Sequence, residues 1–204
     1  MEYYIHHMPV FVVETPTTIS IPEFCAEAEH ALPARLLSAV DVIYIGQFRE
    51  LQGRNAAFLN GAIYMMSTEP TIHDMIENYV HETAHSLEST YGAFIYDDEL
   101  IQEFKGKRTR LRGILEAHGY KINPILYGFT EYNQRFDEFL AEEVGYPTLL
   151  TLTMGLFASP YGATSIQEYF ANGFEKYYLE NPRSLRNISP VLFRKIEEII
   201  NDKT

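Results

Sequence analysis

Cysteine is nearly absent from this sequence, because Cys25 is the only one. No disulfide can therefore form within the chain, which excludes the class of small secreted domains that are held together by disulfides. In the segment IPEFCAEAEHAL the neighbouring apolar residues recur at helical spacing. We therefore expect Cys25 to be a packed core thiol and not a nucleophile.

Basic residues are also scarce. The chain has 16 Lys and Arg against 28 Asp and Glu, a formal net charge of −12. This balance argues against a nucleic-acid partner and against binding to an anionic membrane surface. The basic segment KGKRTRLR at residues 105–112 is predicted to be a solvated loop and helix face, with docking of an anionic partner as the alternative.

Long hydrophobic runs are missing. No segment approaches the roughly 18–20 apolar residues of a membrane span. The N-terminal segment MEYYIHHMPVFVVETP has no Lys or Arg, and its apolar run is shorter than that of a signal peptide. We expect no export signal in this chain, hence a cytoplasmic location unless another route or a longer precursor is used. Nothing in the sequence fixes an oligomeric state.

The segments that are present predict an α+β domain. Short β-branched and aromatic runs at 9–15, 41–48 and 61–67 are typical of strands, and a helix is expected near 21–39. Further helices are predicted near 71–90, 97–117, 131–144, 147–158, 165–180 and 189–201. We expect one domain over 1–204, with a small N-terminal α/β lobe with a mixed sheet (1–70) and a mainly helical lobe (71–204).

The segment ENYVHETAHSLEST at 77–90 carries a His-Glu-x-x-His pattern. Its predicted helix opens at Thr71 with a capping-box pattern and ends before Gly92. Residues four apart on a helix have Cβ atoms roughly 5–6 Å apart, so His81 and His85 can both reach one metal ion. Glu82 is turned about 100° further round the helix, which favours contact with a water on the metal. The alternative is a surface helix with two solvated histidines.

Two later segments compete to supply a third ligand. The first, FDEFLAEEVGYP, offers Glu138 and Glu142. The second, YGATSIQEYFANGFEKYYLENP, offers Glu168 and Glu175. Each pair is predicted to lie on one face of a helix, so spacing alone does not decide between them.

The second segment contributes to a family resemblance. The His-Glu-x-x-His helix, a later Tyr161 and a Glu168 that opens a Glu-aromatic-Phe-Ala run together resemble the peptidase domain of the anthrax lethal factor family, which includes secreted clostridial Pro-Pro endopeptidases. The resemblance covers roughly residues 75–90 and 160–200, with looser agreement in the N-terminal lobe. It implies a zincin-like metalloprotease fold of the gluzincin type.

The same resemblance implies the roles of individual residues. His81, His85 and Glu168 would bind one Zn²⁺ per chain, Glu82 would be the general base, and Tyr161 would donate its hydroxyl to the developing oxyanion. The expected activity is a zinc-dependent endopeptidase that acts on an extended peptide or a flexible protein segment. The substrate would pair with an edge strand, for which we predict the strand containing Gly61, Ala62, Ile63 and Tyr64.

The sequence departs from the family pattern in three ways. Asn172 stands where the family usually has a second glutamate; its amide can still accept a hydrogen bond from a zinc-bound imidazole, but without the charge that raises ligand basicity. The long connection between His85 and Glu168 indicates an insertion within about 95–150, either a lid or a partner interface. The named family members are secreted, whereas we expect no leader in this chain. Substrate preference is not carried over, because the loops that select for proline are not recognisable here.

Several alternatives remain open at this point. Ser165 and Glu168 form a capping-box pattern, so Glu168 could serve only to hold the helix end. Tyr161 could be a packed ring. The whole chain could be a zincin-fold binding or assembly module with a structural or vestigial metal site. The same ion and base could also hydrolyse a non-peptide amide or ester.

Overall fold

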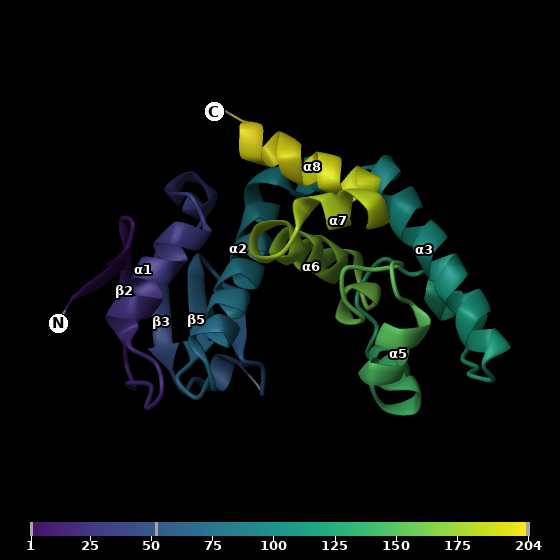
Figure 1. Ribbon diagram of the computed structural model, residues 1–204, viewed down its shortest axis with the longest axis horizontal. Coiled ribbons are helices and arrows are strands. Elements are labelled where there is room, and N and C mark those ends of the chain that lie inside the picture. The colour runs from purple at the N-terminus through teal and green to yellow at the C-terminus, as the bar shows by residue number, and fades with distance from the viewer. Residues whose placement is uncertain (1, 52, 203–204) are drawn as a thin grey trace. The chain divides into compact units, whose positions relative to one another are not determined.

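A computed structural model describes residues 2–51 and 53–202. The chain is α+β, with a five-stranded mixed sheet and 60% helix, which confirms the predicted class. It divides into two compact units, Met1–Gly92 and Ala93–Thr204. The strands lie in the first unit, and the second is helical (Figure 1). The prediction of a single catalytic domain with an insertion at 95–150 stays a prediction.

The sheet of the first unit has the order β1-β2-β3-β5-β4. β2 pairs with β3 and β3 with β5 in parallel, whereas the two outer pairs are antiparallel. The strands are β1 (Tyr3–Ile5), β2 (Met8–Val12), β3 (Val42–Gly46), β4 (Ala56–Leu59) and β5 (Ala62–Met66). The three predicted strands are thus confirmed, while β1 and β4 were not predicted.

One face of this sheet carries the fully buried side chains of Ile43, Ile45 and Ile63. The sheet is accompanied by the helices α1 (Ile21–Ala31) and α2 (Ile72–Ile95), which meet at the buried rings of Phe24 and Tyr79. The predicted helix at 21–39 is too long, because Pro33 follows α1 and residues 34–37 form a short 3-10 helix, η1. A second 3-10 turn, η2, spans Arg49–Leu51.

Cys25 lies on the buried side of α1 and is 7% exposed. Burial is the main cause that raises the pKa of its thiol to about 11, and the charge of Glu29 adds to it. The thiolate is therefore scarce near neutral pH. The prediction of a packed core thiol is confirmed.

The predicted end of α2 before Gly92 is wrong. The helix continues through Gly92 to Ile95, whose side chain is fully buried. A single glycine inside a helix costs only about 1 kcal/mol relative to alanine, and burial of one isoleucine side chain is enough to offset it.

The second unit is built from helices around an aromatic core. Phe104, Phe136, Phe139, Phe170 and Phe174 are fully buried. The α-helices are α3 (Asp98–Ala117), α4 (Gln134–Glu138), α5 (Tyr146–Leu152), α6 (Ile166–Leu179), α7 (Pro182–Ile188) and α8 (Pro190–Asn201). The 3-10 turns are η3 (Pro124–Gly128) and η5 (Tyr161–Ala163), and η4 (Phe139–Val144) is a π-helix.

Helices α6 and α8 approach each other closely at Gly173. A Cβ atom at this position would lie 2.3 Å from Cδ2 of Leu192. A larger residue would therefore require the buried Leu192 side chain to shift, so Gly173 favours the close approach of α8 to the helix that carries Glu168.

The predicted helices of the second unit are confirmed at 97–117, 165–180 and 189–201 as α3, α6 and α8. The prediction at 131–144 becomes α4 followed by η4, and that at 147–158 ends early, at Leu152. Helix α7 was not predicted. Its signal was present, because Asn181 caps it by accepting a hydrogen bond from the Arg183 N–H, and Pro182 occupies its first position.

The basic segment 105–112 is not simply a solvated face. Lys105 and Arg110 are exposed, but Lys107 and Arg108 are buried on the inner side of α3. The predicted solvated helix face is therefore wrong for two of its cations. A charged side chain can enter a core when carbonyl oxygens satisfy its donors, which the sequence pattern does not reveal.

Candidate metal centre

Helix α2 begins with a reciprocal cap. The Thr71 N–H donates to Oδ2 of Asp74 at 3.1 Å, and the Asp74 N–H donates to the Thr71 hydroxyl oxygen at 3.1 Å. The predicted capping box is confirmed. The apolar stripe is buried except at its first position, Ile72, and its buried members are Met75, Ile76, Tyr79, Val80, Thr83 and Leu87. This stripe fixes the rotation of α2 and leaves both histidines half-buried on another side.

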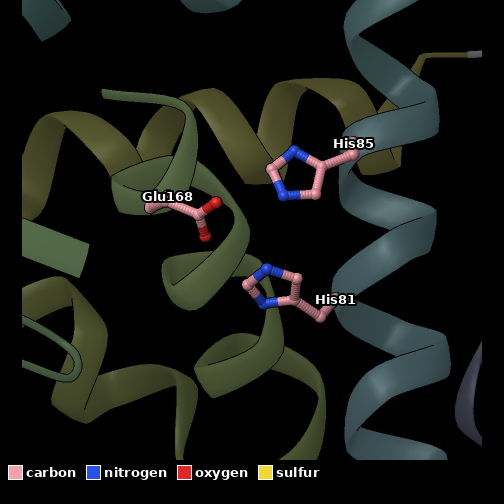
Figure 2. Close-up of side chains that lie close together, drawn as sticks. All are labelled: His81, His85 and Glu168. Atoms are coloured by element: carbon pink, nitrogen blue, oxygen red, sulfur yellow. The ribbon is translucent and has the colours of Figure 1, made fainter. Parts of the chain in front are cut away.

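The ring centroids of His81 and His85 lie 5.0 Å apart, as expected for residues one helical turn apart. Nitrogen atoms of both rings and a carboxylate oxygen of Glu168, on α6, lie within 4.8 Å of one another. Figure 2 shows the Glu168 carboxylate turned toward the two imidazoles. All three residues are half-buried. The arrangement offers two nitrogen ligands and one oxygen ligand to a single ion.

The competing carboxylates do not join this group. Oε1 of Glu138 accepts a hydrogen bond from Nε2 of Gln134 at 2.8 Å, and Glu142 is exposed. In the part of the chain that the structure describes, no other set of three His, Cys, Asp or Glu side chains gathers at ligand distance. Of the two candidate pairs, only Glu168 reaches the histidines.

Glu88 was not predicted to take part. Its Oε1 lies 2.7 Å from Nδ1 of His85, one turn further along α2. A carboxylate at one imidazole nitrogen directs the other nitrogen toward a metal and raises the basicity of the ring. The signal was present in the sequence, because the segment His-Ser-Leu-Glu puts the two residues at the i, i+3 spacing that brings helical side chains together.

Glu82 is buried, with 8% of its surface exposed. Its Oε2 accepts a hydrogen bond of 2.7 Å from the backbone N–H of Phe58, in β4. Phe58 faces Ile63 across the hairpin, at a position where its N–H points away from β5. The carboxylate is therefore oriented by the open edge of the sheet.

The predicted edge strand is not at an edge. Gly61 lies in the turn before β5, and Ala62, Ile63 and Tyr64 lie in β5, which has β3 on one side and β4 on the other. The edge on this side of the sheet is β4. The chain reverses between the two strands at Asn60 and Gly61, both with positive φ (51° and 82°), as in a two-residue hairpin turn.

Helix α6 is capped by Ser165, whose hydroxyl oxygen accepts a hydrogen bond of 3.1 Å from the Glu168 N–H. The cap uses the backbone of Glu168 and does not require its carboxylate. The start of α6 is therefore explained without the alternative hypothesis that Glu168 serves only to hold the helix end.

Tyr161 opens η5, just before this cap. Its half-buried ring meets that of Tyr146 edge to face, with centroids 6.3 Å apart. The Tyr161 carbonyl accepts hydrogen bonds from the N–H and the hydroxyl of Thr164, at 2.9 and 2.8 Å. The backbone at Tyr161 is thus fixed, while the oxyanion role of its hydroxyl stays a prediction.

Asn172 ties two parts of the second unit together. Its Nδ2 donates to the carbonyl of Glu168 at 2.8 Å, and its Oδ1 accepts from the hydroxyl of Ser159. The Ser159 oxygen in turn accepts a weak bond of 3.4 Å from the Gly162 N–H. These bonds link α6 to the loop that leads to Tyr161; acceptance of a bond from a metal-bound imidazole stays a prediction.

Among the described residues, no helix is both long enough and apolar enough to cross a membrane. Comparison of the chain with protein-family models, curated proteins and solved structures gives no match.

Proposed function

We propose that this chain is a zinc-dependent endopeptidase with a zincin-like fold of the gluzincin type. The observation that carries the proposal is the approach of His81, His85 and Glu168 to within 4.8 Å of one another. The resemblance of the sequence around these residues to the lethal factor family supports it. The α+β class with a mixed sheet is compatible with this fold.

The donor set fits zinc. Two imidazoles and one carboxylate are ligands that Zn²⁺ takes in catalytic sites, where three protein ligands leave one position for water or substrate. When bound, the ion would polarise a substrate carbonyl and lower the pKa of a water molecule toward neutrality. One ion per chain is expected.

The chain's own residues have distinct tasks in this proposal. The Glu82 carboxylate takes the proton of the attacking water and delivers it to the leaving amine. Tyr161 donates its hydroxyl to the oxyanion that develops on the scissile carbonyl. The open edge of β4 holds an extended peptide substrate by backbone hydrogen bonds.

Metal content tests the ligand set. We expect about one zinc per chain in the parent and much less in Glu168→Gln, measured by mass spectrometry after dialysis against a weak chelator. The matched control is Glu175→Gln, which makes the same change on the same helix outside the cluster and should keep its zinc. A parent without zinc, even after loading, would contradict the site.

Cleavage of a diverse peptide library tests the activity. Glu82→Gln is the sharp variant, because the glutamine side-chain oxygen can still accept the Phe58 N–H while the base is removed. We expect it to keep its zinc and its stability but to lose cleavage by at least about 100-fold. A Glu82→Gln protein that cleaves as fast as the parent would refute the mechanism.

The second candidate function is a binding or assembly module with a structural metal site. The observation in its favour is the Glu82–Phe58 hydrogen bond, which gives this glutamate a structural task without any reaction. This reading predicts that the zinc-loaded parent cleaves no library peptide. Hydrolysis of a non-peptide amide or ester would appear instead as turnover of small chromogenic amides or esters, lost in Glu82→Gln.

A further inference from the structure

Arg108, on α3, is fully buried, with 0% of its surface exposed. Its Nη1 donates to the backbone carbonyls of Ala163 and Thr164, the latter at 3.2 Å, and its Nη2 donates to that of Leu126 at 2.7 Å. The Phe136 ring centroid lies 3.8 Å from the guanidinium carbon. The guanidinium group is therefore contacted on its flat face by the Phe136 ring and held in place by the hydrogen bonds that it donates.

Such a residue is costly to bury. The three hydrogen-bond acceptors just named are neutral carbonyl oxygens, and burial lowers the pKa of Arg108 to about 9, so the group is still charged at neutral pH. Its Nε finds no hydrogen-bond partner among the described residues. A well-packed apolar side chain would often serve stability as well or better. The forked donor geometry, which fixes several carbonyls at once, is what an apolar residue lacks.

The carbonyls that Arg108 holds belong to one short junction. Ala163 ends η5, which begins with Tyr161, and Thr164 immediately precedes the cap of α6. The Thr164 hydroxyl also donates to the Tyr161 carbonyl at 2.8 Å. The same junction thus determines where Tyr161 lies relative to the first turn of α6, which carries Glu168.

We propose that Arg108 is a positioning residue that fixes the Tyr161 hydroxyl relative to the Glu168 carboxylate by holding the η5–α6 junction. The catalytic consequence rests on the proposed peptidase function. On this view α3, which lies inside the predicted 95–150 insertion, is an internal brace of the site. It is neither a removable lid nor a partner interface.

The chain supplies a control in the preceding residue. Lys107 is also buried (6% exposed), but its Nζ donates to the carbonyls of Leu156 and Ile188, at 2.5 and 2.7 Å. Lys107→Met removes one charge and two carbonyl bonds from α3, whereas Arg108→Lys keeps the charge and loses the forked donor geometry, so Lys107→Met is the larger electrostatic change. Only the Arg108 variant loosens the junction after Tyr161.

Hydrogen exchange followed by mass spectrometry tests the positioning without any activity. The Thr164 N–H bonds the Tyr161 carbonyl at 2.9 Å, and the Glu168 N–H bonds Ser165, so both report on the junction. In Arg108→Lys we expect exchange of peptides covering 161–168 to rise at least about tenfold. In Lys107→Met those peptides should exchange as in the parent, with the change confined to the Leu156 and Ile188 regions.

A kinetic experiment tests whether Arg108 acts through Tyr161. On the library peptide that the parent cleaves best, we expect Arg108→Lys to lower kcat by about 10- to 100-fold with little change in KM. In a Tyr161→Phe background the same substitution should cost less than about threefold, because the hydroxyl it positions is gone. A merely structural role gives equal losses in both backgrounds and overturns the proposal.

The two proposals fail in different ways. A parent that loads zinc but cleaves nothing refutes the peptidase, and the exchange experiment then decides the positioning by itself. Unchanged exchange over 161–168 in folded Arg108→Lys refutes the positioning whatever the activity. If Arg108→Lys melts far below the parent, Arg108→Gln, which keeps a shorter amide donor, replaces it under the same criteria.

Discussion

Glu88 offers the sharpest test of how this chain tunes its proposed metal site. The perturbation is Glu88→Gln, which keeps a side-chain oxygen near Nδ1 of His85 but removes the negative charge. The two atoms lie 2.7 Å apart, and the side chains of His85 and Glu88 are 21% and 24% exposed. The pair is thus mostly shielded from solvent, so screening removes only part of the interaction.

The expected magnitude follows from this geometry. Loss of a carboxylate partner of a ligating histidine typically weakens metal binding by about 10- to 100-fold, or about 1.4–2.7 kcal/mol. Because the pair keeps some solvent contact and glutamine retains an acceptor, we expect the lower part of this range, about 10- to 30-fold. The altered quantity is the dissociation constant of zinc, and global stability of the zinc-free protein should change by less than about 1 kcal/mol.

The assay is competition for zinc with a chromogenic chelator at fixed ionic strength near neutral pH. The matched control is Glu27→Gln, which removes the same charge from an exposed position on α1. Glu27 lies on another helix than the two histidines and its charge is screened by solvent, so we expect less than about a twofold effect. Equal effects of the two variants would mean that only net charge matters and would refute the orientation of His85 by Glu88.

Three further predictions concern the frame around the site. Phe58→Pro removes the N–H that orients Glu82 but leaves the hydrogen bonds between β4 and β5 in place. We therefore expect the free energy of unfolding to fall by about 1–3 kcal/mol and peptide cleavage to slow. Unchanged denaturation and cleavage would contradict this prediction. Gly173→Ala places a Cβ 2.3 Å from Leu192 Cδ2 and should lower the free energy of unfolding by about 1–3 kcal/mol in denaturant titrations. Part of this loss should be recovered in the Gly173→Ala, Leu192→Ala double variant. Fully additive effects of the two substitutions would count against the clash. Burial lowers the pKa of Lys107 to about 8, so the folded state binds fewer protons than the unfolded state between about pH 8 and the ordinary lysine pKa of 10.5. Stability therefore rises with pH in that window, and the parent should gain about 1 kcal/mol between about pH 7 and 9 relative to Lys107→Met; parallel pH profiles would show that Lys107 does not titrate in this way.

Local sequence signals predicted much of the first unit. The strands β2, β3 and β5 follow from β-branched and aromatic runs, and α2 follows from its capping box and apolar stripe. Strand β4 escaped prediction because its sequence, AAFL, is short and half alanine, a poor strand former. The following Asn60-Gly61 pair was the available signal, since it favours a tight hairpin. Recognition of that turn would have placed β4 at the edge in place of β5.

The candidate site could be predicted from the sequence only in part. Periodicity placed His81 and His85 on one helix face, but the choice of Glu168 over Glu138 required a family resemblance, because both glutamates have the right helical spacing. Only the three-dimensional structure brings Glu168 near the histidines. The burial of Arg108 could not be predicted, since the carbonyls that satisfy it come from residues 18 to 56 positions away in the chain.

The Glu82–Phe58 hydrogen bond also affects how β4 behaves toward other chains. An open strand edge with free N–H groups invites pairing with any extended segment, and this is a common start of aggregation. Here a buried carboxylate occupies one of those groups, so the edge is partly blocked. A peptide that pairs with β4 at this position must displace Glu82 and thereby release its carboxylate. In the proposed peptidase, this hydrogen bond protects the strand edge while it is formed, and its loss frees the Glu82 carboxylate to act as the base.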